Sequence, residues 1–161
     1  MKRSSTETDS MVKLTVKLDF EDFPEVHTCR GANRSPPIQV GGLLPDIKSL
    51  AILATASPRE GASRVAWILW NLPAVSLIPG GFPAEGVTES PLPAVQGIND
   101  FGSIGYRGPC PGPGEGEAYL FRVYALDIDL ALHPGATWEE MIRAVEGSLS
   151  QSGEVIAFAI E

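Results

Sequence analysis

The chain has 161 residues, of which 43% are hydrophobic and 20% charged, a size and balance that predict one folded domain with its own core. Twelve basic against twenty acidic side chains give a net charge of −8, which repels nucleic acid and anionic membrane surfaces and excludes both as expected partners. No apolar run approaches the ~18 residues that span a bilayer, so we expect no membrane insertion.

The first eleven residues differ in composition from the rest of the chain. MKRSSTETDS has a basic start but no apolar stretch, which excludes a secretory signal and predicts a disordered N-terminal tail over residues 1–11. Residues 12–161 contain neither an internal repeat nor a linker, so they are predicted to form a single domain. In the absence of a signal, the two cysteines are expected to be free thiols in a cytoplasmic protein.

Five segments have the pattern of β-strands. Residues 12–20, VKLTVKLDF, alternate apolar and polar side chains, which predicts a half-buried strand. Residues 49–56 and 65–72 are nearly continuous apolar runs bounded by Pro and Gly, as in buried strands. Two further strands are predicted at 119–128 and 154–160, and the Gly- and Pro-rich segments between the strands are predicted to be long loops.

One segment, residues 137–151, is predicted to be helical. Thr137 and Glu140 have the spacing of a capping box, in which each side chain bonds the backbone N–H of the other residue. The residues that follow place one apolar face at helical spacing, made of Trp138, Met141, Ile142, Val145 and Leu149. The predicted fold class is therefore mainly β, an antiparallel β-sandwich with one principal C-terminal helix near residues 137–149.

Several motifs together resemble a known family. They are HTCRGANRSPPIQV (27–40), SLAILATASPREGASRVAWILWNLPA (49–74), GINDFGSIGYRGPCPGPG (97–114) and AYLFRVYALD (118–127). In order and spacing they resemble the phosphatidylethanolamine-binding proteins, also called Raf kinase inhibitor-like proteins, in their bacterial and archaeal branch. The resemblance extends over about residues 12–160.

The resemblance implies a fold, a site and a class of function. Two antiparallel sheets would form a sandwich with a small pocket at one end, lined in the family by a DPDAP segment, the His of an HW pair, a GPCP loop and an HRY segment. That pocket accepts phosphate, acetate and similar anions, which stand in for a phospholipid head group or a phosphorylated ligand. Members are mostly described as binding or inhibitory modules rather than enzymes.

This chain departs from the family at most of the polar pocket positions. Residues 55–60, TASPRE, replace the DPDAP segment, Ala66 stands before Trp67, and Glu117 stands where HRY begins. Ser148 also replaces a His in the closing helix. Losing both histidines and both acids removes the charged donors together with their orienting groups. The candidate ligand-binding residues are Gly108, Pro109, Cys110, Tyr119, Glu117, Thr55 and Ala66.

Each candidate has a structural alternative. The N–H groups of Gly108 and Cys110 could form a small anion nest, or the loop could simply close one end of the sandwich. The Tyr119 ring packs as part of a strand, and its hydroxyl could still reach the pocket. Glu115 and Glu117 lie on the same side of an extended segment, where they could bind an ammonium group or belong to a solvated loop.

Two further pairs of residues are considered for the same region. Arg59 and Arg64, in the segment that replaces DPDAP, could supply the positive charge that the missing histidines no longer provide, or remain solvated. His27 and Cys29 resemble half of a nucleophilic site, but the chain offers no orienting third group, so we assign no catalytic residue.

The resemblance also places Cys29 and Cys110 near each other around the pocket. A disulfide would require Cα atoms within about 7 Å, and a reducing cytoplasm opposes it, so free thiols are expected unless the source is hyperthermophilic. A disulfide would instead make the loop a fixed structural corner and would place the protein-interaction hypothesis ahead of the ligand hypothesis.

These observations lead to two functional hypotheses. The first is a non-enzymatic binding module with an altered anion or head-group pocket, which binds a small ligand or has lost small-molecule binding. The alternative is a protein-interaction module that acts as a serine protease or kinase inhibitor. Neither hypothesis requires a cofactor or a metal site, and homodimer formation stays open.

Overall fold

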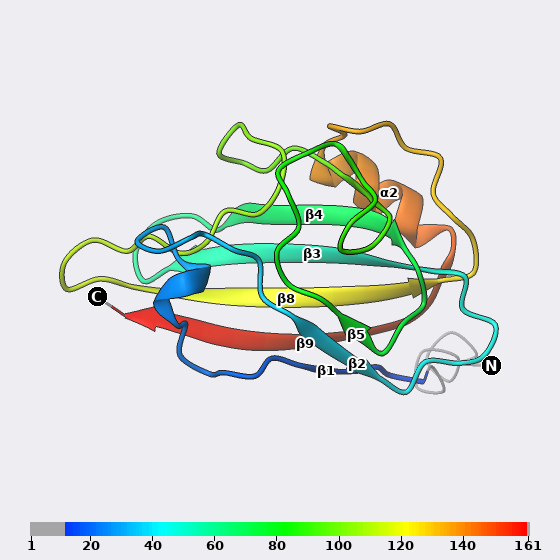
Figure 1. The fold of residues 1–161 in the computed structure, drawn as a ribbon, viewed down its shortest axis with the longest axis horizontal. Coiled ribbons are helices and arrows are strands. Elements are labelled where there is room, and N and C mark those ends of the chain that lie inside the picture. Colours follow the sequence, from blue (N-terminus) through cyan, green and yellow to red (C-terminus); the bar gives the residue numbers. More distant parts are fainter. Residues whose placement is uncertain (1–11, 161) are drawn as a thin grey trace, which may run out of the picture.

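The computed structural model describes residues 12–160, and the predicted N-terminal tail, residues 1–11, lies outside this range. Two sheets lie face to face (Figure 1). The larger sheet contains six strands in the order β6 (Val87–Thr88), β7 (Ala94–Gln96), β4 (Arg64–Leu72), β3 (Ser49–Pro58), β8 (Gly116–Leu126) and β9 (Leu149–Ile160). The smaller sheet contains β1 (Thr15–Lys17), β2 (Ile38–Gly41) and β5 (Leu77–Ile78). All strand pairs are antiparallel, which confirms the predicted fold class.

The main core lies between the two sheets. On β8 the odd-numbered residues Tyr119, Phe121 and Val123 face this core, at 1%, 0% and 0% exposure, because successive side chains of a strand point to opposite faces. The smaller sheet contributes Val16 and Ile38 from the other side. This arrangement explains why β3 and β4 have nearly continuous apolar sequences, since both strands are buried over much of their length.

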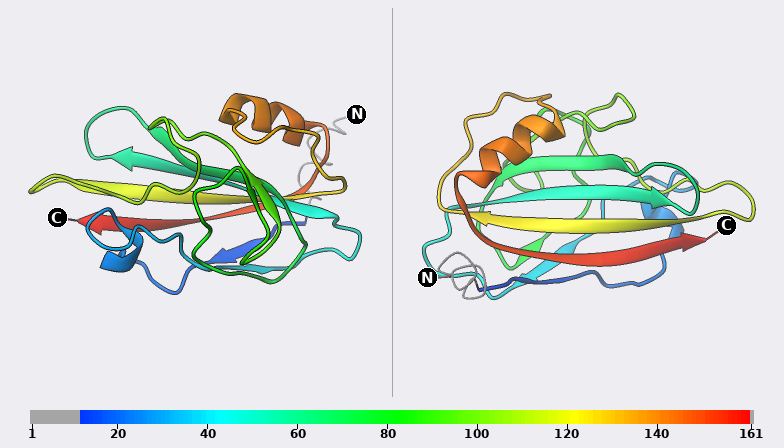
Figure 2. Two further views of the ribbon diagram at one scale, coloured as in Figure 1. Left: turned by 45° about the horizontal axis from the view of Figure 1, so that its top comes forward. Right: turned by 180° about the vertical axis from the view of Figure 1, so that it is seen from behind.

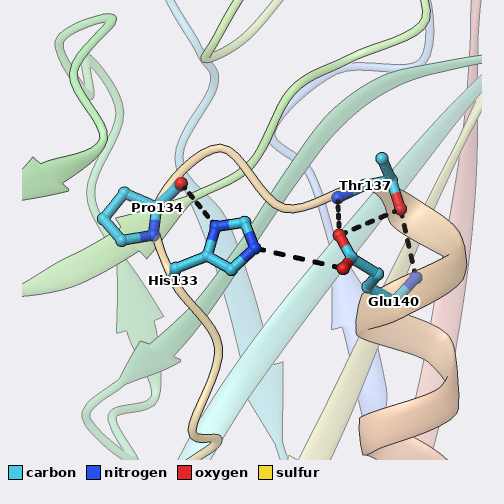
Figure 3. Close-up of polar contacts among 4 residues, drawn as sticks. All are labelled: His133, Pro134, Thr137 and Glu140. Atoms are coloured by element: carbon cyan, nitrogen blue, oxygen red, sulfur yellow. Dashed lines mark hydrogen bonds and ion pairs between the residues drawn. The ribbon is translucent and has the colours of Figure 1, made fainter.

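A second core lies on the outer face of the large sheet, under α2 (Trp138–Glu146). The helix begins with the predicted capping box: the Thr137 N–H donates to Glu140 Oε1 at 2.9 Å, and the Glu140 N–H donates to Thr137 Oγ1 at 3.3 Å. His133 Nε2 lies 4.0 Å from Glu140 Oε2 (Figure 3). Met141 and Val145 are buried against the sheet. Figure 2 shows the helix over one end of this face.

Several predicted boundaries differ from the structure: the strands predicted at 119–128 and 154–160 extend over 116–126 and 149–160, and the helix and the first strand are shorter than predicted. The helix ends at Glu146 rather than near 149–151, because Leu149 and Gln151 already pair with the end of β8 and begin β9. The first strand is three residues long instead of nine. Leu14 is buried as predicted, but Val12 is 46% exposed because the chain reaches the core only from Leu14 onward. Among residues 12–160 no helix is long and apolar enough to cross a membrane.

Candidate functional site

The candidate site lies at the end of the large sheet where β3 and β9 finish and β8 begins. Two adjoining hollows occur there, with volumes of about 250 and 260 Å³. The first hollow is lined by segments 58–60, 110–111 and 114–117. The second is lined by Ala56, Pro58, residues 60–62, Arg64, Phe101 and Glu117. Pro58, Glu60 and Glu117 line both hollows, so these residues form the wall between them.

The backbone donors of the GPCP loop (residues 108–111) are already bonded within the protein. The Gly108 N–H donates to Asn33 Oδ1 at 2.8 Å, and the Cys110 N–H donates to Glu117 Oε1 at 3.1 Å. Gly108 must be a glycine, because a Cβ there would overlap the carbonyl oxygen of His27. The two N–H groups considered for an anion nest therefore bind side-chain oxygens of this chain.

Glu117 thus has a structural role that its sequence position did not reveal. A carboxylate accepting a backbone N–H satisfies that donor in the same way as an external anion would. Glu115 behaves similarly, accepting the Gly112 N–H on Oε1 at 2.6 Å. With Glu60, these residues place three carboxylates on the first hollow, against the single guanidinium of Arg59.

The expectation of free thiols is wrong, because Cys29 and Cys110 form a disulfide with Cα atoms 5.4 Å apart. Both cysteines of the chain are therefore oxidised. Backbone and side-chain bonds hold the same two segments together: the Cys29 N–H donates to Pro109 O at 3.2 Å and Arg30 Nη2 to Pro111 O at 3.0 Å. These contacts place Cys29 and Cys110 together, as the resemblance implied.

His27 is part of the same support and not of a nucleophilic site. Its side chain is buried, stacks on Phe20 with ring centroids 5.4 Å apart, and has Nδ1 2.7 Å from Arg34 O. The His27 carbonyl accepts the Tyr106 hydroxyl at 2.7 Å. Because Cys29 is in a disulfide, His27 has no thiol to activate.

Tyr119 and Ala66 are buried and line neither hollow. Ala66 is 0% exposed and Tyr119 is 1% exposed. The Tyr119 hydroxyl donates to Arg107 O at 2.6 Å, so it points into the structure. Burial raises the pKa of Tyr119, neighbouring Glu117 raises it further, and Arg107 lowers it. The phenol consequently stays neutral and acts as a hydrogen-bond donor.

Thr55 lies on the other face of the sheet from the hollows. Ala56 lines the second hollow, and alternation along β3 turns the neighbouring Thr55 away from it. Thr55 pairs with Val65 and Leu120 instead. Of the seven candidates, the structure brings Cys110 and Glu117 to a hollow, while Gly108 and Pro109 of the same loop are buried and line neither hollow. Ligand contact at these positions stays a prediction.

Three residues complete the site beyond those selected from the sequence. The Phe101 ring has two guanidinium groups close to it, with Arg107 Cζ 4.3 Å and Arg64 Cζ 5.3 Å from its centroid, a cation–π arrangement. Asn33 bridges the loop by also donating from Nδ2 to Tyr106 O at 3.3 Å. Arg64 was considered from the sequence as a source of positive charge. No local sequence pattern indicated a role for Phe101, Arg107 or Asn33. Within residues 12–160 no cluster of His, Cys, Asp or Glu suited to a metal ion occurs.

Comparisons with known proteins agree with this architecture. The family model for phosphatidylethanolamine-binding protein matches residues 15–158. A UPF0098 protein of Pyrococcus abyssi is 42% identical over 150 residues, covering 92% of this chain and 84% of its own length. The crystal structure of a phosphatidylethanolamine-binding protein homolog from Chlamydia trachomatis superposes with a TM-score of 0.79 at 28% identity, covering 92% of this chain and 98% of that one.

A second solved structure supports the fold alone. E. coli YbcL, described as a member of the mammalian PEBP family, superposes with a TM-score of 0.78 at 24% identity, over 94% of this chain and 99% of that one. The fold agrees with both solved structures, and the family model covers residues 15–158. The chain belongs to the phosphatidylethanolamine-binding protein family.

Proposed function

We propose that this protein is a non-enzymatic binding module whose site takes a small ligand carrying an ammonium group in preference to phosphate. The observation that carries the proposal is the hydrogen bond from the Cys110 N–H to Glu117 Oε1. Through this bond the chain's own carboxylate occupies a donor that a phosphate oxygen would need. An anion entering the first hollow would also meet Glu60 and Glu115.

The energetic argument follows from the missing donors. A hydrogen bond to a charged group contributes about 1.5–3 kcal/mol, so losing one lowers affinity roughly ten- to a hundred-fold. An ammonium group needs acceptors instead of donors. Among the bonds described, Glu117 and Glu115 each use only one carboxylate oxygen to accept a backbone N–H. The second carboxylate oxygens supply acceptors for it.

A non-enzymatic role is supported by the chemistry of the groups at the site. The two sulfurs are joined in a disulfide, and His27 Nδ1 is engaged by the Arg34 carbonyl. The other histidine, His133, lies at the start of α2 beside Glu140. The Tyr119 phenol is buried and its pKa is raised. Neither histidine lines either hollow and neither sulfur is a free thiol, so the ionisable side chains that line the two hollows are carboxylates and guanidinium groups.

The test is a titration of the full chain, with the backbone amide shifts of Arg59, Glu60, Cys110, Gly112 and residues 114–117 as the readout. Ethanolamine should shift these resonances at lower concentration than inorganic phosphate, whose affinity we expect to be about millimolar or weaker. Glu117→Gln should weaken ethanolamine binding, and Glu139→Gln, which removes the same charge from an exposed position on α2, should not. Tighter binding of phosphate than of ethanolamine at these amides contradicts the proposal.

A second candidate function, protein interaction, is supported by the disulfide. An exposed loop that is held rigid before binding loses little conformational entropy when a partner contacts it, which is the property of a good inhibitory loop. The disulfide and the bonds of Cys29 and Arg30 fix the loop at its base. By the expectation drawn from the sequence, the disulfide alone would rank this candidate first. We rank the ligand candidate first because a charged hollow lies beside the fixed loop.

The two candidates are separated by an inhibition assay. If the loop acts on serine proteases, the full chain should inhibit a trypsin- or chymotrypsin-like enzyme, and the Cys29→Ala/Cys110→Ala variant should lose that inhibition. If neither these proteases nor a panel of kinases is inhibited, the protein-interaction candidate in its inhibitory form is wrong.

A further inference from the structure

The outer face of the large sheet is only partly covered. α2 lies over the end at which β8 finishes and β9 begins, where Met141 and Val145 pack with Trp70, Tyr124 and other residues of the second core. Figure 2 (right) shows the far end of β8 and β9 extending well beyond the helix. Within residues 12–160 no helix or strand covers that end of the face.

The uncovered end carries an apolar strip made of Leu120, Ile156, Phe158 and Ile160. Ile156, Phe158 and Ile160 are alternate residues of β9, so they project from the same face, and they are 49%, 47% and 75% exposed. Leu120 is the cross-strand neighbour of Ile156. Leu120 and the three β9 side chains belong to neither core cluster. Several large apolar side chains gathered on one exposed face are typical of an interaction surface.

The edge of β9, in contrast to its face, is already occupied beside Phe158. The Phe158 N–H donates to Glu21 O at 2.8 Å, and the Phe23 N–H donates to Phe158 O at 2.8 Å. Farther along, the Leu14 N–H donates to Ser152 O at 3.0 Å. These bonds block the pairing of an added strand at this edge, so a partner has to pack on the face.

We propose that the apolar strip is the interface through which two copies of this chain form a weak, symmetric dimer, with their large sheets packed face to face. The strip is suited to a second copy because its three β9 side chains form one row along the strand. A two-fold axis parallel to β9 brings each of these side chains against its own counterpart, Phe158 against Phe158 at the centre, as an isologous interface requires.

The exposed area of the apolar strip determines how tightly the two copies are expected to bind. A phenylalanine buries about 150–250 Å² when fully packed, so the 47% exposure of Phe158 leaves roughly 70–120 Å² uncovered. With the two isoleucines the three side chains expose roughly 300 Å², the lower end of patches that are often functional. A standard interface buries about 800 Å² per partner. The strip thus forms an apolar centre, and the dimer is expected to be weak and dependent on concentration.

Charge explains why two acidic chains can meet at this place. Segments 118–121 and 155–160 contain no charged residue, and Glu154 is neutralised by Arg122 at 2.9 Å. Asp22, which bridges to Phe158, lies along one side of the strip, and Arg59 lies near Gly116 on the other. With the two-fold axis along β9, the Asp22 side of each copy faces the Arg59 side of the other.

The test is sedimentation equilibrium of the full chain between about 10 µM and 1 mM, with a Kd read from the rise in mass above 17.1 kDa. We expect Phe158→Glu to raise the Kd at least tenfold, because it places like charges at the centre of the interface. Asp22→Arg should raise the Kd as well. Ile128→Glu, at a residue that is also 49% exposed but lies outside the strip, should leave it within about twofold.

Circular dichroism and the thermal midpoint check that each variant is folded. If Phe158→Glu fails to fold, Ile160→Lys replaces it, since that side chain is 75% exposed and makes fewer contacts. A wild-type mass that stays at 17.1 kDa over the whole range overturns the proposal. It is equally overturned by a dimer whose Kd does not change in Phe158→Glu or Ile160→Lys, because such a dimer uses another surface.

Discussion

Removing the disulfide should destabilise the protein through the unfolded chain rather than through the site. In Cys29→Ala/Cys110→Ala the folded loop keeps the bonds from Cys29 N–H to Pro109 O and from Arg30 to Pro111 O. The unfolded chain, however, gains the freedom of a loop closed across a sequence separation of 81 residues. The chain-entropy relation gives about 4.5 kcal/mol for a loop of this length, and measured losses are commonly about 2–4 kcal/mol.

The assay is urea unfolding at 25 °C, with the thermal midpoint as a second measurement. For a chain of this size 1 kcal/mol corresponds to about 2–4 °C, so the full entropic value corresponds to roughly 9–18 °C. Reducing the wild type should reproduce the loss, and the double alanine variant should not respond to reductant. The unfolded, unreduced wild type should show no reactive thiol. A loss below about 1 kcal/mol would refute the entropic reasoning.

Two further predictions concern buried and capping groups. Trp67 and Trp70 are both 0% exposed, but Trp67 Nε1 donates to Gln96 Oε1 at 2.7 Å, while Trp70 Nε1 has no partner among the described residues. Trp67→Phe should therefore cost about 1–3 kcal/mol more in urea unfolding than Trp70→Phe, and equal losses would contradict the assigned role of the bond. The hydrogen bond from the Thr137 backbone N–H lowers the pKa of Glu140 below its ordinary 4.5, so its stabilising contribution is present above that pH and is lost as pH falls through the lowered value. The stability difference between wild type and Glu140→Gln should shrink between pH 7 and about pH 3.

The long strands and the helix start could be predicted because their signals are local. The apolar runs at 49–56 and 65–72 correspond to β3 and β4, and the capping box at Thr137 is formed as its spacing indicated. The end of the helix could not be predicted from the helical pattern. Leu149 continues that pattern, yet the residues after Gly147 gain the long ladder with β8. Sheet pairing outweighs local propensity there.

The site was harder to predict because its bonds join residues distant in the sequence. Asn33 reaches Gly108, and Cys29 reaches Cys110 across 81 residues. The resemblance placed the two cysteines together, but an assumption about the compartment favoured thiols over the disulfide. Thr55 was chosen by its position in a replaced motif, although strand alternation, which is local, already separates it from Ala56. Applying alternation outward from the buried Tyr119 and Ala56 would have identified the correct face.

The role of Glu117 shows why a substituted pocket can keep its loop geometry. From the sequence, Glu117 could be interpreted only as a possible partner of an ammonium group or as part of a solvated loop. In the structure, its carboxylate is the acceptor for the Cys110 N–H, and Asn33 is the acceptor for the Gly108 N–H. A loop that presents bare N–H groups needs a bound anion or water to satisfy them. Here internal acceptors satisfy both donors, so the loop can retain its conformation without any ligand.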